Sequence, residues 1–238
     1  DGTFVNIRAF AREYGDYSGP FADNPFRIRV TQVAVRRAEP PVPEIFMKDT
    51  VSSFAEMAEK NGGKTLYAKG PAEIVPTIRG LIESGGEKGL DLVFVIAATE
   101  SMKDDIGTVR TDLVPALEEA LAGYPDWRVA LVLYKDYDED FLVRQAISFT
   151  RDLSAFRKAL WSFRVQGGRD IPEAVYEGLD GALSLPWTPS WDRTVILIGD
   201  APPHPKPRGK HTKESVEAAA AAKGVELNVI ILPHGETY

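Results

Sequence analysis

The chain has 238 residues, of which 44% are hydrophobic and 26% charged, and this composition is typical of a globular rather than a disordered protein. Its net charge of −7 argues against non-specific nucleic-acid binding, which needs a basic surface. The absence of cysteine excludes disulfides, thiol catalysis and cysteine-ligated zinc. No apolar run reaches the roughly 20 residues that cross a membrane, so we expect no transmembrane segment. An intracellular and a bacterial extracytoplasmic location both fit the composition, and we expect the second.

The first 45 residues are predicted to form a β-rich accessory hairpin. Candidate strands at residues 3–10 and 26–35 flank a loop rich in glycine, proline, aspartate and asparagine. Apolar and polar residues alternate along 26–31, the pattern of a half-buried strand. Three prolines within residues 40–43 predict an extended linker. We therefore assign residues 46–238 to a second domain.

The second domain alternates helical and strand patterns. Residues 51–60 predict a helix that ends at Gly62, residues 65–68 a short strand, and residues 71–84 a further helix. The segment after that predicts strands at 92–98, 127–134, 141–149, 194–199 and 227–232, and helices at 102–122, 153–163, about 174–183 and 213–223. Asp152 is a candidate N-cap and Gly224 a helix stop. The loop 135–140 is too short for a helical crossover, so its two strands are predicted to pair antiparallel. We therefore predict an α/β, Rossmann-like, mostly parallel sheet with helices on both faces.

Oxygen-bearing side chains are found in three loops of the second domain. Two of these loops follow predicted strands, and the third precedes a predicted helix. Thr99 and Ser101 follow one strand, Asp170 and Glu173 lie in a loop before a helix, and Asp200 follows another strand. Open α/β sheets bind ligands at the carboxyl edge, where such side chains meet. Hydroxyls and carboxylates without cysteine suit a hard cation such as Mg²⁺, Mn²⁺ or Ca²⁺. A single aspartate of this kind would more often cap a helix, but three converging loops favour a metal or anion site.

These loops resemble those of the von Willebrand factor A domain family. The first reads Ala-Ala-Thr-Glu-Ser over residues 97–101, followed by Met-Lys-Asp-Asp, which is similar to the A domains of integrin β chains. The second reads Asp-Ile-Pro-Glu over 170–173, and the third Ile-Gly-Asp-Ala over 198–201. The wider strings Gly-Gly-Arg-Asp-Ile-Pro-Glu-Ala and Asp-Ala-Pro-Pro-His look closer still to bacterial A domains. The resemblance covers about residues 89–232.

The resemblance implies a metal-ion-dependent adhesion site. Thr99 and Ser101 would be direct ligands of Mg²⁺ or Mn²⁺, Asp170 or Glu173 would supply an acid, and Asp200 would contact the ion or hold a ligand water. In this family a partner's acidic side chain completes the coordination of the ion. The resemblance therefore implies a protein-binding module that catalyses nothing.

Two neighbouring acids, Asp104 and Asp105, have two interpretations. By resemblance they would match an adjacent Ca²⁺ site. From the residues alone they would stabilise a helix N-terminus through its macrodipole.

Ala97 departs from the family pattern, which has aspartate at this position. Alanine removes one charge and two acceptors, so divalent-cation affinity should fall. A naturally degraded site and an engineered substitution both account for it, and the intact second and third loops favour the latter.

The order of elements also departs from the family pattern. The chain stops soon after residues 227–232, without the usual closing helix, strand and helix. Residues 46–88 resemble that closing segment, so we predict a circularly permuted fold with residues 65–68 beside residues 227–232. An unrelated N-terminal module joined to a truncated sheet is the alternative.

Two further functions stay open. A metal-dependent hydrolase would use Asp170, Glu173, Asp200 and His204 as ligands and base, whereas a structural scaffold would carry a vestigial site. His204 lies near the predicted metal edge and would contact a ligand, shape its loop or lie on the surface. His211 and His234 have no evident partners and are predicted to be solvated. The four tryptophans are predicted to pack in the core or at its rim.

Overall fold

The computed structural model describes residues 45–83, 85–168 and 171–234. The predicted N-terminal hairpin, at residues 1–45, lies outside the described residues except for Ile45, and so does Asp170. None of the helices in these three ranges is long and apolar enough to cross a bilayer.

Helices and strands alternate along the described chain as the sequence patterns predict. In order they are α1 (Lys48–Lys60), β1 (Thr65–Tyr67), α2 (Pro71–Ile82), β2 (Leu90–Ala97), α3 (Ile106–Ala120), β3 (Trp127–Tyr134), β4 (Val143–Thr150), α4 (Leu153–Trp161), α5 (Val175–Leu183), β5 (Asp192–Gly199), α6 (Lys213–Lys223) and β6 (Glu226–Ile231). Short 3₁₀ turns, η1 (Glu100–Lys103) and η2 (Leu121–Gly123), flank α3.

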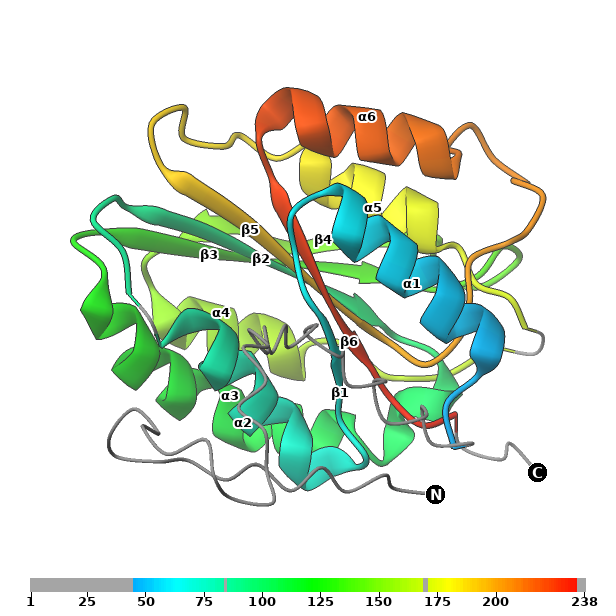
Figure 1. The fold of residues 1–238 in the computed structure, drawn as a ribbon. Coiled ribbons are helices and arrows are strands. Elements are labelled where there is room, and N and C mark those ends of the chain that lie inside the picture. The colour runs from blue at the N-terminus through cyan, green and yellow to red at the C-terminus, as the bar shows by residue number, and fades with distance from the viewer. Residues whose placement is uncertain (1–44, 84, 169–170, 235–238) are drawn as a thin grey trace, which may run out of the picture. The chain divides into compact units, whose positions relative to one another are not determined.

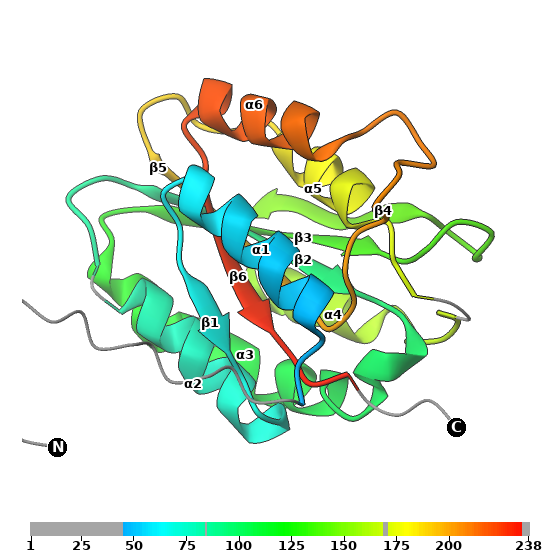
Figure 2. The ribbon, with the colours of Figure 1, turned by 45° about the vertical axis from the view of Figure 1, so that its right-hand side comes forward.

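The strands form one six-stranded sheet in the order β1-β6-β5-β2-β3-β4. Every neighbouring pair is parallel except β3 and β4, so the predicted antiparallel hairpin is confirmed. Helices α2, α3 and α4 cover one face of the sheet, and α1, α5 and α6 cover the other (Figures 1 and 2). The predicted Rossmann-like α/β architecture is therefore confirmed.

The core is centred on β2. All eight of its residues are buried, because the strand is covered on both faces and has a partner on each side. Strand β4, which lies at one edge of the sheet, keeps its side chains half-buried or exposed. The carboxyl ends of the parallel strands β2 and β5 therefore lie at the same edge of the sheet, next to the buried core around β2.

The predicted neighbourhood of the first and last strands is confirmed. Thr65 pairs with Val229, and Tyr67 with Ile231, in a parallel ladder. The pairing continues through the Ala68 N–H, which donates to the Ile231 carbonyl at 3.1 Å. Figure 1 shows β1 at the sheet edge next to β6, although more than 150 residues separate them in the chain. This is the pairing that the permuted arrangement requires.

The long helix predicted at residues 102–122 is interrupted in the structure. The N–H groups of Met102 and Asp105 donate to Thr99 and Met102, each three residues back, which makes a 3₁₀ turn. The α-helix begins only at Ile106.

Two other predicted helix ends are confirmed. Asp152 caps α4 by accepting from the N–H groups of Ser154 and Ala155, and Gly224 ends α6 in the left-handed conformation with φ of 59°.

The close approach of α1's end to β6 depends on Gly63. A Cβ atom on this residue would lie 2.0 Å from the Leu227 carbonyl oxygen, which is backbone and cannot rotate away. We expect Gly63→Ala to lower the free energy of unfolding by about 1–3 kcal/mol, since the β1 edge must shift. Gly80→Ala is the matched control, because Gly80 is exposed in α2 and a Cβ there meets nothing within 4 Å.

Urea denaturation of both variants measures this difference. The control should gain up to about 1 kcal/mol from alanine's higher helix propensity. Equal stabilities for the two variants would contradict the close approach.

Candidate functional site

The first and third loops meet at the carboxyl edge of the sheet. Strands β2 and β5 are parallel neighbours that end at Ala97 and Gly199. The Ser101 hydroxyl donates to Asp200 Oδ1 at 3.1 Å, and the Thr99 and Ser101 hydroxyl oxygens lie 3.2 Å apart. Thr99 and Asp200 are each only 1% exposed. Three of the predicted site residues thus form one hydrogen-bonded chain.

The second loop brings Glu173 to the same place. Its N–H donates to the Pro202 carbonyl at 2.9 Å, so the second loop is joined to the third by backbone. Its side chain is 3% exposed, and Oε2 has no hydrogen-bond partner. Burial, reinforced by the negative charge of Asp200, raises the pKa of Glu173 to about 8, and the Thr99 hydroxyl only partly opposes this. Glu173 is therefore a buried acid that lacks a compensating positive charge.

Asp104 and Asp105 lie in the turn that precedes α3. Asp104 is exposed, whereas Asp105 is 7% exposed. Asp105 occupies the N-cap position of α3, but its side chain makes no capping hydrogen bond. Burial, followed by the charges of Asp200 and Asp104, raises the pKa of Asp105 to about 6. The surroundings of Asp105 thus disfavour its charged form, whereas stabilisation by the helix macrodipole would favour that form.

Ala97 ends β2 as a fully buried residue paired in register with Tyr134. The Tyr134 hydroxyl is also buried, and it has no hydrogen-bond partner. Burial raises the pKa of Tyr134 well above its usual value, and the nearby charges of Glu173 and Asp200 add to this. A Cβ atom on Gly199 would lie 2.4 Å from this hydroxyl. Tyr134 therefore belongs to the surroundings of the site. The register of β3 on β2 brings it there, and no sequence motif marks it.

The prediction that His234 is solvated and without a partner is wrong. Its Nδ1 lies 2.7 Å from Asp200 Oδ2, and its side chain is 20% exposed. The hydrogen bond to Asp200 raises the pKa of His234, although burial opposes the shift. The residue lies three positions beyond β6, the strand next to β5, so strand order was the information needed to find it. His211 also has a partner, since its Nδ1 lies 3.4 Å from Asp180 Oδ1.

His204 serves the second of its three predicted roles, because it shapes the loops around the site. Its Nε2 lies 2.6 Å from Oδ1 of the buried Asp136, in the loop between β3 and β4. Its ring meets Tyr137 edge-on, with centroids 5.5 Å apart. The same acidic loop reaches the second loop through Glu139, which accepts the Gly168 N–H at 2.9 Å. His204 thus fastens the proline-rich third loop to the β3–β4 loop.

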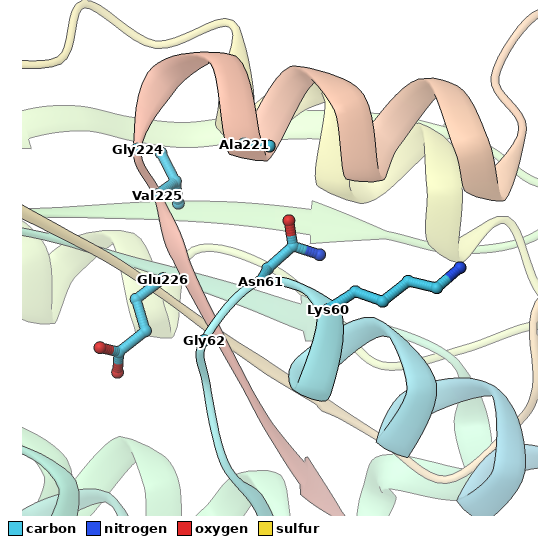
Figure 3. Close-up of a pocket in the computed structure, with 7 residues that line it drawn as sticks. All are labelled: Lys60, Asn61, Gly62, Ala221, Gly224, Val225 and Glu226. Carbon is cyan, nitrogen blue, oxygen red and sulfur yellow. The ribbon is translucent and has the colours of Figure 1, made fainter.

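The described surface has one hollow beside the site and others away from it. A groove of about 540 Å³ adjoins the site and has a wall rich in proline; it is lined by Met47, Asp49, Ser52, Ser53, Ile171, Pro172, Tyr176, Pro202, Pro203 and Pro205. A smaller hollow of about 300 Å³ lies at the opposite edge of the sheet, where α1 and α6 end and β6 begins (Figure 3). None of the predicted site residues lines the smaller hollow, which sets it apart from the carboxyl edge.

The donor set at the carboxyl edge can be compared with what a metal ion needs. Within the described ranges, no three histidine or acidic side chains are grouped as ligands of one ion. The available donors are instead two hydroxyls, from Thr99 and Ser101, and two carboxylates, from Glu173 and Asp200. Oxygen donors of this kind suit Mg²⁺ or Mn²⁺, and the unpartnered Glu173 Oε2 is an available ligand atom. These four residues could hold such an ion, and Ala97 offers no ligand atom of its own.

Comparison with known proteins gives relatives of partial length. The chain is 34% identical over 118 residues to alpha-protein kinase vwkA of Dictyostelium discoideum, covering 48% of this chain and 19% of the relative. It is 30% identical over 131 residues to the non-ribosomal peptide synthetase CmlP of Streptomyces venezuelae, covering 50% of this chain and 13% of the relative. The chain thus matches less than a fifth of the length of these curated relatives.

The solved structures that the chain matches include a VWA domain and a pilus adhesin. The VWA domain of SpRpn10 has a TM-score of 0.41 and 13% identity, covering 62% of this chain and 89% of that one. The pilus adhesin SpaC from Lactobacillus rhamnosus GG has a TM-score of 0.38 and 21% identity, covering 48% of this chain and 16% of that one. The family model described as von Willebrand factor A domain matches residues 91–236, more than half of the chain. This chain belongs to the von Willebrand factor A domain family.

Proposed function

We propose that this domain is a protein-binding module whose contact with a partner centres on a divalent cation held by Thr99, Ser101, Glu173 and Asp200, and that Ala97 weakens the binding of that ion. Domains of this family often mediate protein interactions. The observation that carries the proposal is the pair of buried carboxylates beside two hydroxyls, with Glu173 Oε2 left without a partner.

A cation is the simplest means of stabilising this arrangement. Burying an unpaired carboxylate costs several kcal/mol, and a second carboxylate nearby adds repulsion. The described residues place no lysine or arginine in a salt bridge with Glu173 or Asp200; the partner of Asp200 is His234. Mg²⁺ or Mn²⁺ would supply the missing charge and take oxygen ligands from both loops. A Ca²⁺ ion beside Asp104 and Asp105 would relieve the charge repulsion on Asp105 in the same way.

The partner would complete the coordination of the ion with an acidic side chain. A shared cation bridges an acidic surface and an acidic ligand, which otherwise repel each other. The chain's net charge of −7 makes a direct, metal-free contact with such a ligand unfavourable. The adjoining groove of about 540 Å³ would accommodate neighbouring residues of the partner.

Binding accounts for the site better than catalysis does. A hydrolase needs a general base within hydrogen-bond reach of a nucleophile or a substrate. Among the described hydrogen bonds, the Thr99 and Ser101 hydroxyls contact each other, Ser101 alone donates to Asp200, and no histidine nitrogen contacts either hydroxyl. Asp200, the carboxylate within reach of Ser101, is 1% exposed, which leaves a substrate little access to it. We therefore extend the proposal to a domain without catalytic activity.

Ala97→Asp is expected to raise the affinity for Mn²⁺ and Mg²⁺ by at least about tenfold, because it adds a charged acceptor to the first loop. Isothermal titration calorimetry on the metal-free protein measures the change. Ala97→Asn is the matched control: it has nearly the same size in this fully buried position but carries no charge. Thermal unfolding of both variants reports whether the larger side chain is accommodated.

The outcomes separate the competing functions. Asp200→Ala in the Ala97→Asp background should abolish the gained affinity. Equal, negligible binding by folded wild-type and Ala97→Asp proteins would reject the metal-centred function and favour a structural scaffold. Equal gains for the aspartate and asparagine variants would show that charge at position 97 is not the missing component.

A further inference from the structure

The segment beyond β6 stays attached to the end of β5. The Leu232 N–H donates to the Gly199 carbonyl at 3.1 Å, which extends the parallel pairing one residue past the end of β6. This bond holds the backbone at the carboxyl edge of the sheet. His234, two residues further on, is thereby brought to the side of Asp200.

Asp200 is bound from three directions by three separate parts of the chain. Its backbone carbonyl accepts the Thr50 hydroxyl of α1 at 2.9 Å. Its Oδ1 accepts from Ser101 at 3.1 Å, and its Oδ2 lies 2.7 Å from His234 Nδ1. The two carboxylate oxygens therefore have different surroundings. Oδ1 faces the pair of hydroxyls, and Oδ2 faces the imidazole.

The different surroundings of the two oxygens matter because a carboxylate rotates easily about its last torsion angle. The Ser101 hydroxyl alone would follow either oxygen, since it can itself rotate. The imidazole is a planar ring on a backbone segment held by the Leu232 bond, so its Nδ1–H direction is much better defined. Asp200 is 1% exposed, so water has little access to replace that donor.

We propose that His234 is a positioning residue, which donates its Nδ1–H to Asp200 Oδ2 and so keeps Asp200 Oδ1 turned toward Thr99 and Ser101. The arrangement of the carboxylate is a property of the metal-free protein. The consequence for metal affinity rests on the proposed function, because it requires that an ion binds at Oδ1. Outer partners that orient a ligating carboxylate typically change metal affinity by about 10–100-fold when removed.

The assignment specifies which imidazole nitrogen carries the proton, and this can be measured without any metal. In ¹⁵N-labelled, metal-free protein, long-range ¹H–¹⁵N correlation spectra should show His234 protonated at Nδ1. Asp200→Ala should remove this preference, whereas the spectrum of His211, whose partner is Asp180, should stay unchanged. An Nδ1 of His234 that is unprotonated, or a signal that ignores Asp200→Ala, would overturn the proposal.

The second experiment measures Mn²⁺ affinity by calorimetry in the Ala97→Asp background, where binding is expected to be strong enough to quantify. His234→Ala should weaken binding by about 10–100-fold. His234→Asn should recover most of the loss, because its side-chain amide offers a donor at about the position of Nδ1. His211→Ala is the matched control and should bind as the background does, and thermal unfolding confirms that each variant is folded.

The two experiments distinguish failure of the proposed function from failure of the positioning role. If Ala97→Asp itself binds no metal, the proposed function is rejected, and the nitrogen measurement still decides the role of His234. If the metal binds and His234→Ala leaves the affinity unchanged, the positioning role is overturned. Loss in His234→Ala without recovery in His234→Asn would also overturn it, because the donor would not be what matters.

Discussion

Replacing Asp91 with alanine is expected to lower the free energy of unfolding by about 3–5 kcal/mol, because it leaves a mostly buried guanidinium without its partner. Asp91 lies in β2 and is fully buried. Its Oδ1 accepts from Arg128 Nε at 2.8 Å and its Oδ2 from Arg128 Nη2 at 2.7 Å, a bidentate pair between neighbouring strands. Its Oδ2 also accepts the Thr188 N–H at 2.6 Å, so one carboxylate joins β2, β3 and the loop before β5.

Urea denaturation compares this variant with Asp126→Ala. Asp126 makes a bidentate pair with Arg151, but the two side chains are 43% and 59% exposed. Solvent screens such a pair, so its loss should cost at most about 1 kcal/mol. If the two variants lost similar stability, burial would not be what makes the Asp91–Arg128 pair important.

The stability of the metal-free protein is expected to fall as the pH rises from 5 to 8, and Glu173→Gln should remove much of this dependence. The pKa of Glu173 is raised from 4.5 to about 8, so the folded state binds its proton more tightly than the unfolded state does. Stability from this group is therefore full below about pH 4.5 and is lost as the pH rises toward 8. Each pKa unit corresponds to about 1.4 kcal/mol, so the loss amounts to a few kcal/mol.

Two other groups also lower the stability as the pH rises, and they account for the pH dependence that remains in Glu173→Gln. Asp105, with its pKa raised to about 6, contributes a smaller loss at lower pH. His234, with its pKa raised above 6.5, contributes stability that is lost as the pH rises through its folded-state pKa. Glu173→Gln should therefore be more stable than the wild type at pH 8 and retain a weaker slope.

Thermal unfolding in chelator-containing buffers across this pH range tests the expectation. Glu118→Gln is the control, because Glu118 is exposed on α3, away from the site, and the change removes one carboxylate without altering a buried one. Parallel pH profiles for wild type and Glu173→Gln would contradict the picture of an uncompensated buried acid. In buffer without chelator, Mn²⁺ should stabilise Ala97→Asp at pH 8 more than the wild type if, as proposed, the ion binds the folded state at this site.

The order and type of nearly all the helices and strands could be predicted from the amino-acid sequence, because each element carries a local signal. The apolar run from Leu92 to Ala97 in β2, the Asp152 cap and the Gly224 stop can each be recognised over a few residues. The break before α3 was missed, because the hydrogen bonds of its 3₁₀ turn leave no distinct spacing of apolar residues.

The convergence of Thr99, Ser101 and Asp200 was also predictable, since the carboxyl ends of parallel strands share one edge. What could not be predicted was which other groups reach that edge. The Tyr134 hydroxyl arrives there through the register of β3 on β2, and His234 through the pairing of β6 with β5. Neither residue stands in a recognisable motif, so sequence spacing alone carries no sign of them.

The family, the sheet and the main oxygen donors could thus be predicted from residues that are close together in the sequence. This is because each strand and loop geometry requires its own local pattern of residues. The structure was needed for the environment of those donors: the burial that raises the pKa of Glu173 and the imidazole that faces Asp200. This is because burial, charge and hydrogen-bond direction depend on distances between segments that are far apart in the chain, as in the bond from the Val229 N–H to the Lys64 carbonyl, which spans 165 residues. Such distances exist only once the sheet has formed.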